Sequence, residues 1–505
     1  MRLCALAAAC STMFAAATVR AEDRVLAANT FTRGWATFGV ALPQGAAKAG
    51  VKVGALPTQT DVKVRWPDGS IRFAVVTANV PRAGALPIVA GPAATGAAAA
   101  ANPQVAVTLT IGGRPYVATL PASLSDPWLS GPLVSEGRAI VAPGGHPFLR
   151  VIFDVRSYAG GGQRVDVTTE NTLDVASADQ VTYDVAIAIA GKPVFQQANV
   201  VHKYLSRWRQ VFATGGLDES IVAPNLTAFA VATALPAYLP TVAQPKRALT
   251  GTGVSGTGFG ILGFGDLTVP MNAHSGRPEL APYPDWTAQY LVGGRADQRA
   301  YVLRHGELAG SWGVHIKEPD GQTFVSIDKH PYYWLDRRWV ENKPIFDGPK
   351  NLMKGAAEPG DVAHQPSLAF VPYLVTGDRF FADEMAYWAN YCLIGSFASD
   401  DNRKGAQGLL IGNEVRGIGW GLRTMGDAAA YLPDASPVKA YLAAKVWNNL
   451  TFLDNYAATY QSGPVQSLFP NRRPEDGMAQ YQPYMWISLW EQSYLAWAVD
   501  RVMQH

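Results

Sequence analysis

The sequence predicts a multidomain β + α protein, in which an N-terminal β-barrel or sandwich is followed by an α/α toroid-like helical domain. The first observation is that residues 22–215 contain short strand-like segments separated by Gly and Pro. The second is that from residue 284 to 505 the apolar side chains recur at helical spacing. Residues 216–283 show neither pattern clearly, and we interpret them as a connecting region.

The composition limits the class of protein. The chain has 505 residues, of which 48% are hydrophobic and 16% are charged. Such a chain can fill large cores and differs from a disordered one. Its formal net charge is only +2, so no strongly basic field favours nucleic acid as a partner.

Residues 1–21 have the features of a signal peptide. Arg2 supplies a positive charge, residues 3–17 are apolar, and Val-Arg-Ala ends at Ala21. We expect cleavage after Ala21 and a periplasmic or secreted location; lipoprotein processing at Cys10 is the alternative. Cys392 would then be the remaining cysteine, and its apolar helical surroundings predict a buried, unreactive thiol. No later segment of the sequence predicts a membrane-spanning helix.

The β region is best defined by one hairpin. Residues 62–66 alternate in character, Pro-Asp-Gly-Ser at 67–70 forms a turn, and residues 71–76 resume as a strand. Further strands are predicted at 105–111, 150–155, 164–170 and 181–189. Residues 83–101, rich in Ala, Gly and Pro, are predicted to be a loop.

The connecting region contains a glycine-rich stretch at residues 251–265. It has the spacing of a dinucleotide-binding loop, but no strand–helix–strand unit precedes it. We therefore interpret it as a flexible connection.

The helical region contains a weak repeat. Tyr290, Tyr373 and Tyr431 each begin an aromatic–aliphatic pair that is followed by a Gly or Pro turn and a new helical pattern. Stacked helix pairs form either a solenoid or a closed α/α toroid. Helices are expected to begin near Trp286 and to occupy residues 297–308, 364–375, 380–394, 413–431, 437–460 and 481–503.

A resemblance adds to this interpretation. The hairpin sequence Trp-Pro-Asp-Gly-Ser-Ile-Arg at residues 66–72 resembles the N-terminal barrel domain of the exo-rhamnogalacturonan lyase superfamily. A basic and aromatic stretch at residues 202–209 is similar to the end of that domain. The resemblance implies a β-barrel joined to a helical toroid, and cleavage of uronic-acid-containing polysaccharides by β-elimination.

Candidate catalytic residues lie at expected helix starts and loops. In a toroid these positions surround a central pocket, so His364, His330, His274 and Arg416 are predicted to converge. Elimination requires a group that neutralises the uronate carboxylate, a base and an acid. Arg suits the first role, while His and Tyr suit the other two. A residue at a helix start can also simply cap the helix.

The predicted site follows from these roles. The predicted catalytic residues are His364, His330, Arg416, Tyr391 and Tyr481. The predicted substrate-binding residues are His274, Arg277, Tyr332, Gln365, Glu414, Trp420, Asn171, His202 and Arg207. The predicted partner is an acidic polysaccharide or oligosaccharide, with neither a cofactor nor a metal.

Two alternatives stay open from the sequence. A glycoside hydrolase would use two carboxyl groups, and Glu414, Asp361, Asp285 and Glu491 are available for that role. A non-catalytic protein that binds or assembles glycans would need only a groove. Neither the polysaccharide nor the choice between exo and endo action follows from the sequence.

Overall fold

The computed structural model describes residues 25–96, 102–238, 254, 256–273, 276–280, 282–335, 355–400, 402–460 and 488–505. Its strands are β1 (Val25–Phe31), β2 (Gly34–Ala41), β3 (Val51–Val53), β4 (Thr58–Arg65), β5 (Ile71–Val80), β6 (Gly84–Ala90), β7 (Val105–Ile111), β8 (Arg114–Thr119), β9 (Ser125–Ser130), β10 (Val134–Val141), β11 (Arg150–Tyr158), β12 (Gln163–Asn171), β13 (Val181–Ile189), β14 (Lys192–His202), β15 (Ser206–Thr214) and β16 (Val222–Ala223). Its α-helices are α1 (Leu226–Val231), α2 (Asp285–Gly293), α3 (Ala296–Leu308), α4 (Phe370–Thr376), α5 (Arg379–Ile394), α6 (Val415–Tyr431), α7 (Pro437–Tyr460) and α8 (Leu489–Met503).

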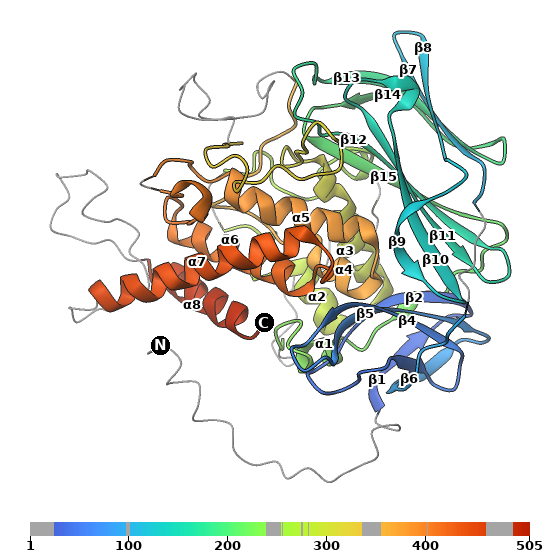
Figure 1. Ribbon diagram of the computed structural model, residues 1–505, viewed down its shortest axis with the longest axis horizontal. Helices are drawn as coiled ribbons and strands as arrows, with labels where there is room; N and C mark the ends of the chain where they lie inside the picture. Colours follow the sequence, from blue (N-terminus) through green and yellow to red (C-terminus); the bar gives the residue numbers. More distant parts are fainter. Residues whose placement is uncertain are drawn as a thin grey trace.

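The mixed β and α organisation, with the helices mainly in the C-terminal half, is confirmed. The strands pair antiparallel in four sheets of order β16-β1-β6-β3, β2-β5-β4, β15-β12-β11-β10-β9 and β14-β13-β7-β8. In the described residues each sheet ends in two edge strands, so the expected barrel is not formed. The sheets build a wall along one side of the helices, on the right in Figure 1. The closed toroid remains a prediction.

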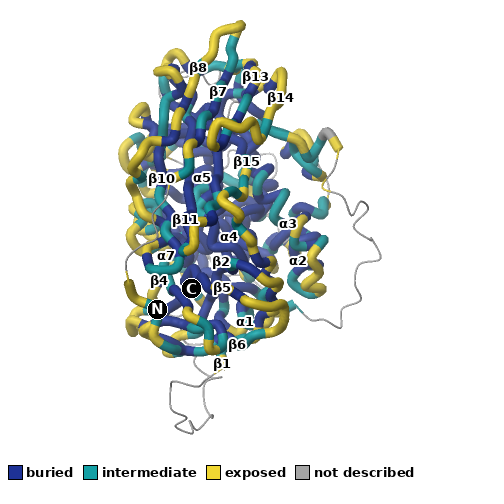
Figure 2. Tube along the Cα trace, turned by 90° about the vertical axis from the view of Figure 1, so that its right-hand side faces the viewer, coloured by how far each residue is buried: buried dark blue, intermediate teal, exposed yellow. Residues whose placement is uncertain are grey.

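Strand β5 joins the two parts of the core. Its side chains alternate between two apolar surroundings, and both faces are buried. Val76 faces the small core between the two N-terminal sheets, whereas Phe73 packs on Tyr373 of α4 with ring centroids 4.9 Å apart. Figure 2 shows this buried interior passing between the sheets and helices, with the exposed residues toward the rim.

The predicted hairpin is strands β4 and β5, and its turn anchors it to the helices. Gly69 has a φ of 80°, which a residue with a side chain rarely adopts, and the Ser70 amide bonds to Asp68 Oδ1 at 2.9 Å. After the turn, the Arg72 guanidinium lies 4.3 Å from the ring centroid of Trp66 and 4.7 Å from that of Tyr431 on α6. The hairpin is therefore an interface between the β and helical parts.

The five-stranded sheet meets the helices through buried ion pairs. Asp378, the residue before α5, lies 3.2 Å from Arg156, 2.6 Å from Arg164 and 3.6 Å from Arg209, all on the sheet. Burial alone would raise the pKa of Asp378, but the three guanidinium groups hold it well below its usual value. These contacts fix the start of α5 against the sheet.

The helical predictions are largely confirmed. Helices α2 and α4 end at Gly294 and Gly377, which have φ values of 64° and 69° and so reverse the chain as the repeat predicts. One start was wrong: α4 begins at Phe370 rather than at residue 364. The residue before it, Ala369, continues a loop in which Pro366 disfavours an earlier helix.

Two loop predictions need correction. Residues 84–90 of the expected loop form β6, because Leu86 and Ile88 pack into the N-terminal core and pair with β1. The connecting region contains β16 and α1. In the part of the chain that is described, no helix combines the length and apolar character needed to cross a membrane.

Two buried histidines predict a pH dependence of stability. Burial lowers the pKa of His202 and of His505 to about 4, whereas an unfolded His titrates near about 6.5. Between these values the unfolded chain binds protons that the folded chain does not, so the free energy of unfolding decreases as the pH falls. We expect roughly 1 kcal/mol per pH unit for each residue. Urea unfolding at several pH values in this interval gives the free energy of unfolding as a function of pH. This dependence should be less steep for His505→Gln than for the wild-type protein, and equal steepness would contradict the prediction.

Candidate functional site

The loop before α4 holds an aspartate–histidine pair. Asp361 Oδ2 lies 2.6 Å from Nδ1 of His364, and His364 is only 4% exposed. Because a carboxylate accepts a proton on Nδ1, the free lone pair of the neutral ring lies on Nε2. Nε2 is buried and has no hydrogen-bond partner among the residues that the structure describes.

Charged side chains surround this pair. Arg277 donates to the carbonyl oxygen of Met271 at 2.7 Å, and the Met271 sulfur accepts the Asp361 amide at 3.2 Å. Burial lowers the pKa of Arg277, while the nearby carboxylates of Glu279 and Asp361 oppose this and Arg416 adds to it. We call Asp361, His364, Arg277, Glu279 and Arg416 the dyad cluster.

Several polar atoms of the dyad cluster are buried without a hydrogen bond. Besides His364 Nε2 they include Nε and Nη1 of Arg277, Oε2 of Glu279 and Nε of Arg416. Buried polar atoms are normally bonded, and unbonded ones mark a place where water or a ligand belongs. Arg277 Nε does lie 3.5 Å from Glu279, but the other atoms make the dyad cluster a candidate for a ligand site.

Helix α6 brings Arg416 to this loop. Arg416 forms an ion pair with Glu414, and Trp420, one turn later on the same helical face, donates to the carbonyl oxygen of Ala363 at 3.0 Å. Between them Gly417 lets the helix backbone approach, since a Cβ there would lie 3.3 Å from the carbonyl oxygen of Val362. These contacts bring the first turn of α6 beside the loop that carries His364, while a pocket shared by His364 and Arg416 stays a prediction.

Helix α5 supplies the opposite support. The Tyr391 ring lies against the loop, because a Cβ at Gly360 would be 2.7 Å from its Cε1 atom. Gln365 donates to the carbonyl oxygen of Trp388 at 2.8 Å and accepts from the Cys392 thiol at 3.2 Å. Gln365 is fully buried with both ends of its amide bonded to α5, so it positions the loop. Burial raises the pKa of Cys392 to about 12, which confirms a buried thiol.

His330 is not joined to the dyad cluster by any contact of the described residues. Its Nε2 lies 3.0 Å from Glu318 Oε1, and its ring faces Tyr333 at a centroid distance of 6.0 Å. Tyr332 donates to Asp400 at 3.0 Å on the surface. His330 is therefore held by Glu318, and no described contact supports its expected convergence with His364 and Arg416.

Three predicted substrate-binding residues are structural instead. Arg207 is 1% exposed and lies 3.2 Å from Glu170 and 3.4 Å from Glu384. His202 is fully buried between the hydroxyl of Tyr183 and the carbonyl oxygen of Ser206. The Asn171 amide bonds to the carbonyl oxygen of His202 at 3.3 Å. The printed partners of these three side chains all belong to the chain itself, which is typical of a structural role.

Two further predicted residues, His274 and Tyr481, lie outside the described residues. Within the described ranges no group of three His, Cys, Asp or Glu side chains is placed to hold a metal ion.

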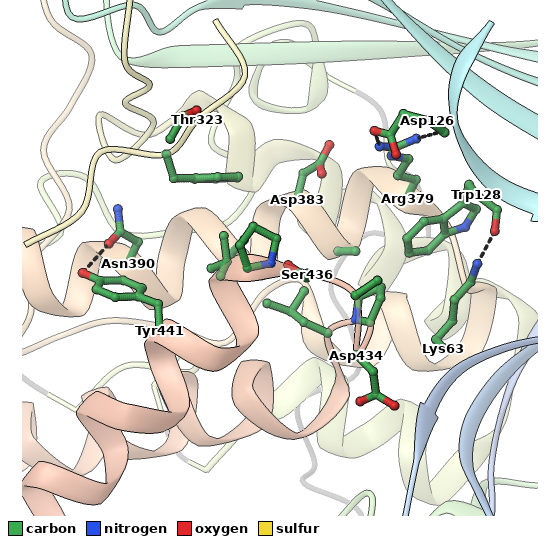
Figure 3. Close-up of a pocket in the computed structure, with 18 of the residues that line it drawn as sticks. Lys63, Asp126, Trp128, Thr323, Arg379, Asp383, Asn390, Asp434, Ser436 and Tyr441 are labelled. Carbon is green, nitrogen blue, oxygen red and sulfur yellow. Dashed lines mark hydrogen bonds and ion pairs between the residues drawn. The ribbon is translucent and has the colours of Figure 1, made fainter. Parts of the chain in front are cut away.

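A groove that the sequence did not predict lies between the sheets and the helices. It is a cavity of about 880 Å³, and Figure 3 shows Lys63, Trp128 and Arg379 at one end and Asn390 and Tyr441 at the other. Helix α5 forms one side with residues that recur at helical spacing (Arg379, Asp383, Ala386 and Asn390). That spacing is visible in the sequence, but the residues that line the rest of the groove come from distant parts of the chain, among them β4, β9 and α7.

Comparisons with family models, curated proteins and solved structures found no match. The function is therefore inferred from the geometry of the dyad cluster and the groove.

Proposed function

We propose that this protein is a secreted carbohydrate-active enzyme, a polysaccharide lyase that cleaves a uronic-acid-containing glycan by β-elimination. The observation that carries the proposal is the buried, unbonded Nε2 of His364, which Asp361 orients; the charge of Asp361 also acts on Arg277, as does that of Arg416. The resemblance of the 66–72 hairpin to the exo-rhamnogalacturonan lyase superfamily points to the same reaction.

In the proposed reaction Arg416 binds the uronate carboxylate. Its present partner, Glu414, has a side chain that is 58% exposed, so a substrate carboxylate can replace it. A guanidinium remains charged and bonds both carboxylate oxygens, which stabilises the negative charge that develops when C5 loses its proton. The ion pair is the exposed part of the cluster, so the sugar approaches from this side.

His364 is the proposed base. Nε2 removes the C5 proton, the electron pair forms the C4–C5 double bond, and the bond from C4 to the leaving oxygen breaks. Tyr391 protonates that oxygen and then regains a proton from the imidazolium of His364. Asp361 keeps the ring in the required tautomer and stabilises its protonated form.

The test is an assay on a panel of plant, algal and bacterial acidic polysaccharides. Elimination creates an unsaturated uronate that absorbs in the ultraviolet, so we expect absorbance to rise with the wild-type protein on at least one substrate. Arg416→Gln should slow this rise, whereas Arg295→Gln, which removes a 64% exposed arginine on another surface, should not. No absorbance on any substrate would contradict the proposal.

A further inference from the structure

The groove has the size and polar lining of a ligand site. Its volume of about 880 Å³ lies in the range of small-molecule pockets. At the end opposite Lys63, the Tyr441 hydroxyl donates to Asn390 Oδ1 at 3.2 Å (Figure 3). Asn390 in turn donates to the carbonyl oxygen of Val325 at 2.7 Å. Asn390 is only 1% exposed, and the Tyr441 hydroxyl also accepts the Ile327 amide at 3.2 Å, so this end offers the half-buried, ordered Tyr441 hydroxyl to a ligand.

The carboxylates of the groove already have cationic partners. Asp383 lies 2.8 Å from Arg138, and Asp434 lies 2.9 Å from Lys439. Asp126 pairs with Arg379, and Asp328 pairs with Lys445. Burial alone would raise the pKa of Asp383, but Arg138, Arg207 and Arg379 hold it well below its usual value, so it stays an acceptor.

Unlike the carboxylates of the groove, Lys63 forms no ion pair with a described residue. Its ammonium donates to the carbonyl oxygen of Trp128 and lies 4.1 Å from the centroid of that ring. In the described part of the chain no carboxylate forms an ion pair with it; Asp61 and Glu136 act only at longer range. Burial lowers the pKa of Lys63 to about 8, as expected for a cation without a close counter-ion.

We infer that the groove is a second glycan-binding site, separate from the dyad cluster, in which Lys63 binds the carboxylate of a uronate unit and Tyr441, held by the buried Asn390, binds a hydroxyl group farther along the glycan. The two sites lie on different faces of α5: Asn390 lines the groove, whereas Tyr391 lies against the loop of the dyad cluster. The choice of a uronate rests on the proposed function, but binding in the groove requires no turnover.

The experiment measures binding without catalysis. Trimers of galacturonic, glucuronic and mannuronic acid are titrated calorimetrically into the His364→Ala protein, at slightly alkaline pH and in two buffers of different ionisation enthalpy. A carboxylate beside Lys63 raises the pKa of the ammonium, so binding should take up protons. Lys63→Gln, added to the same background, should weaken binding at least about 10-fold and abolish the proton uptake.

Controls separate this site from the proposed lyase centre. Lys192 is an exposed lysine on β14 outside the groove, so Lys192→Gln should change neither the affinity for the trimer nor the proton uptake on binding. The methyl ester of the best-binding trimer should bind equally to the proteins with and without the Lys63→Gln substitution, because its carboxylate charge is gone. Equal binding of the free acid by both proteins, or no binding of any trimer, would overturn the inference even if lyase activity is found. Lysine-dependent binding would support it even if no elimination is detected.

Discussion

His364→Ala is expected to lower kcat/KM on a uronate polymer by about 10²–10⁴-fold, the usual cost of removing a positioned acid or base. The substitution removes Nε2, the atom to which no described group is bonded. Because the substitution leaves the buried Asp361 carboxylate without its partner, the urea midpoint should also fall, so kcat is measured on protein shown to be folded. A purely structural histidine would leave the kcat of that folded protein near the wild-type value.

Asp361→Asn provides the matched variant. Its amide can donate to Nδ1, which would place the ring proton on Nε2 and leave His364 without a lone pair for the substrate. We expect a loss of kcat in a protein whose fold is intact. Near-normal turnover in both variants would show that the dyad cluster is not the catalytic centre.

Asp378→Asn is expected to destabilise the protein by about 3–5 kcal/mol, the cost of breaking a buried ion pair. The side chain of Asp378 is 6% exposed, and its carboxylate forms ion pairs with Arg156, Arg164 and Arg209. Without it these guanidinium groups would face one another in a buried interface. Urea unfolding measures the effect.

The control is an exposed pair of the same type. Asp218 lies 2.8 Å from Arg33, and their side chains are 51% and 72% exposed. Asp218→Asn should change the free energy of unfolding by less than about 1 kcal/mol. Equal effects of the two substitutions would contradict the structural role assigned to Asp378.

The order of strands and helices could be predicted because it depends on local periodicity. The hairpin turn at Gly69 and the helix ends at Gly294 and Gly377 could be predicted because each needs a residue with a positive φ angle, which glycine adopts readily. Closure of the sheets could not be predicted in this way, because it depends on which strands pair at the edges.

A pocket shared by His364 and Arg416 stays a prediction. Asp361 was considered only as a carboxylate of a hydrolase, whereas in the structure it bonds to Nδ1 of His364. Arg207 was mistaken for a binding residue because a sequence does not show that Glu170 and Glu384 neutralise it. Its alternation with Arg209 along β15, on one face of the sheet, was the available signal of a polar interface.

The groove was missed for a different reason. Lys63, Trp128 and Tyr441 belong to β4, β9 and α7, and only the tertiary structure brings these elements together (Figure 3). No local pattern distinguishes Lys63 from other lysines, since the lack of an ion pair with any described carboxylate is a property of the folded protein.

Digestion of the best uronate substrate in oxygen-18 water tests the central claim most directly. Elimination takes no oxygen from the solvent, so the oligosaccharide products should carry no label at the bond that is cleaved. Their unsaturated ends should make them one water lighter than hydrolysis products. These lighter products should not form with His364→Ala. Labelled products of full mass would identify a hydrolase and contradict the account.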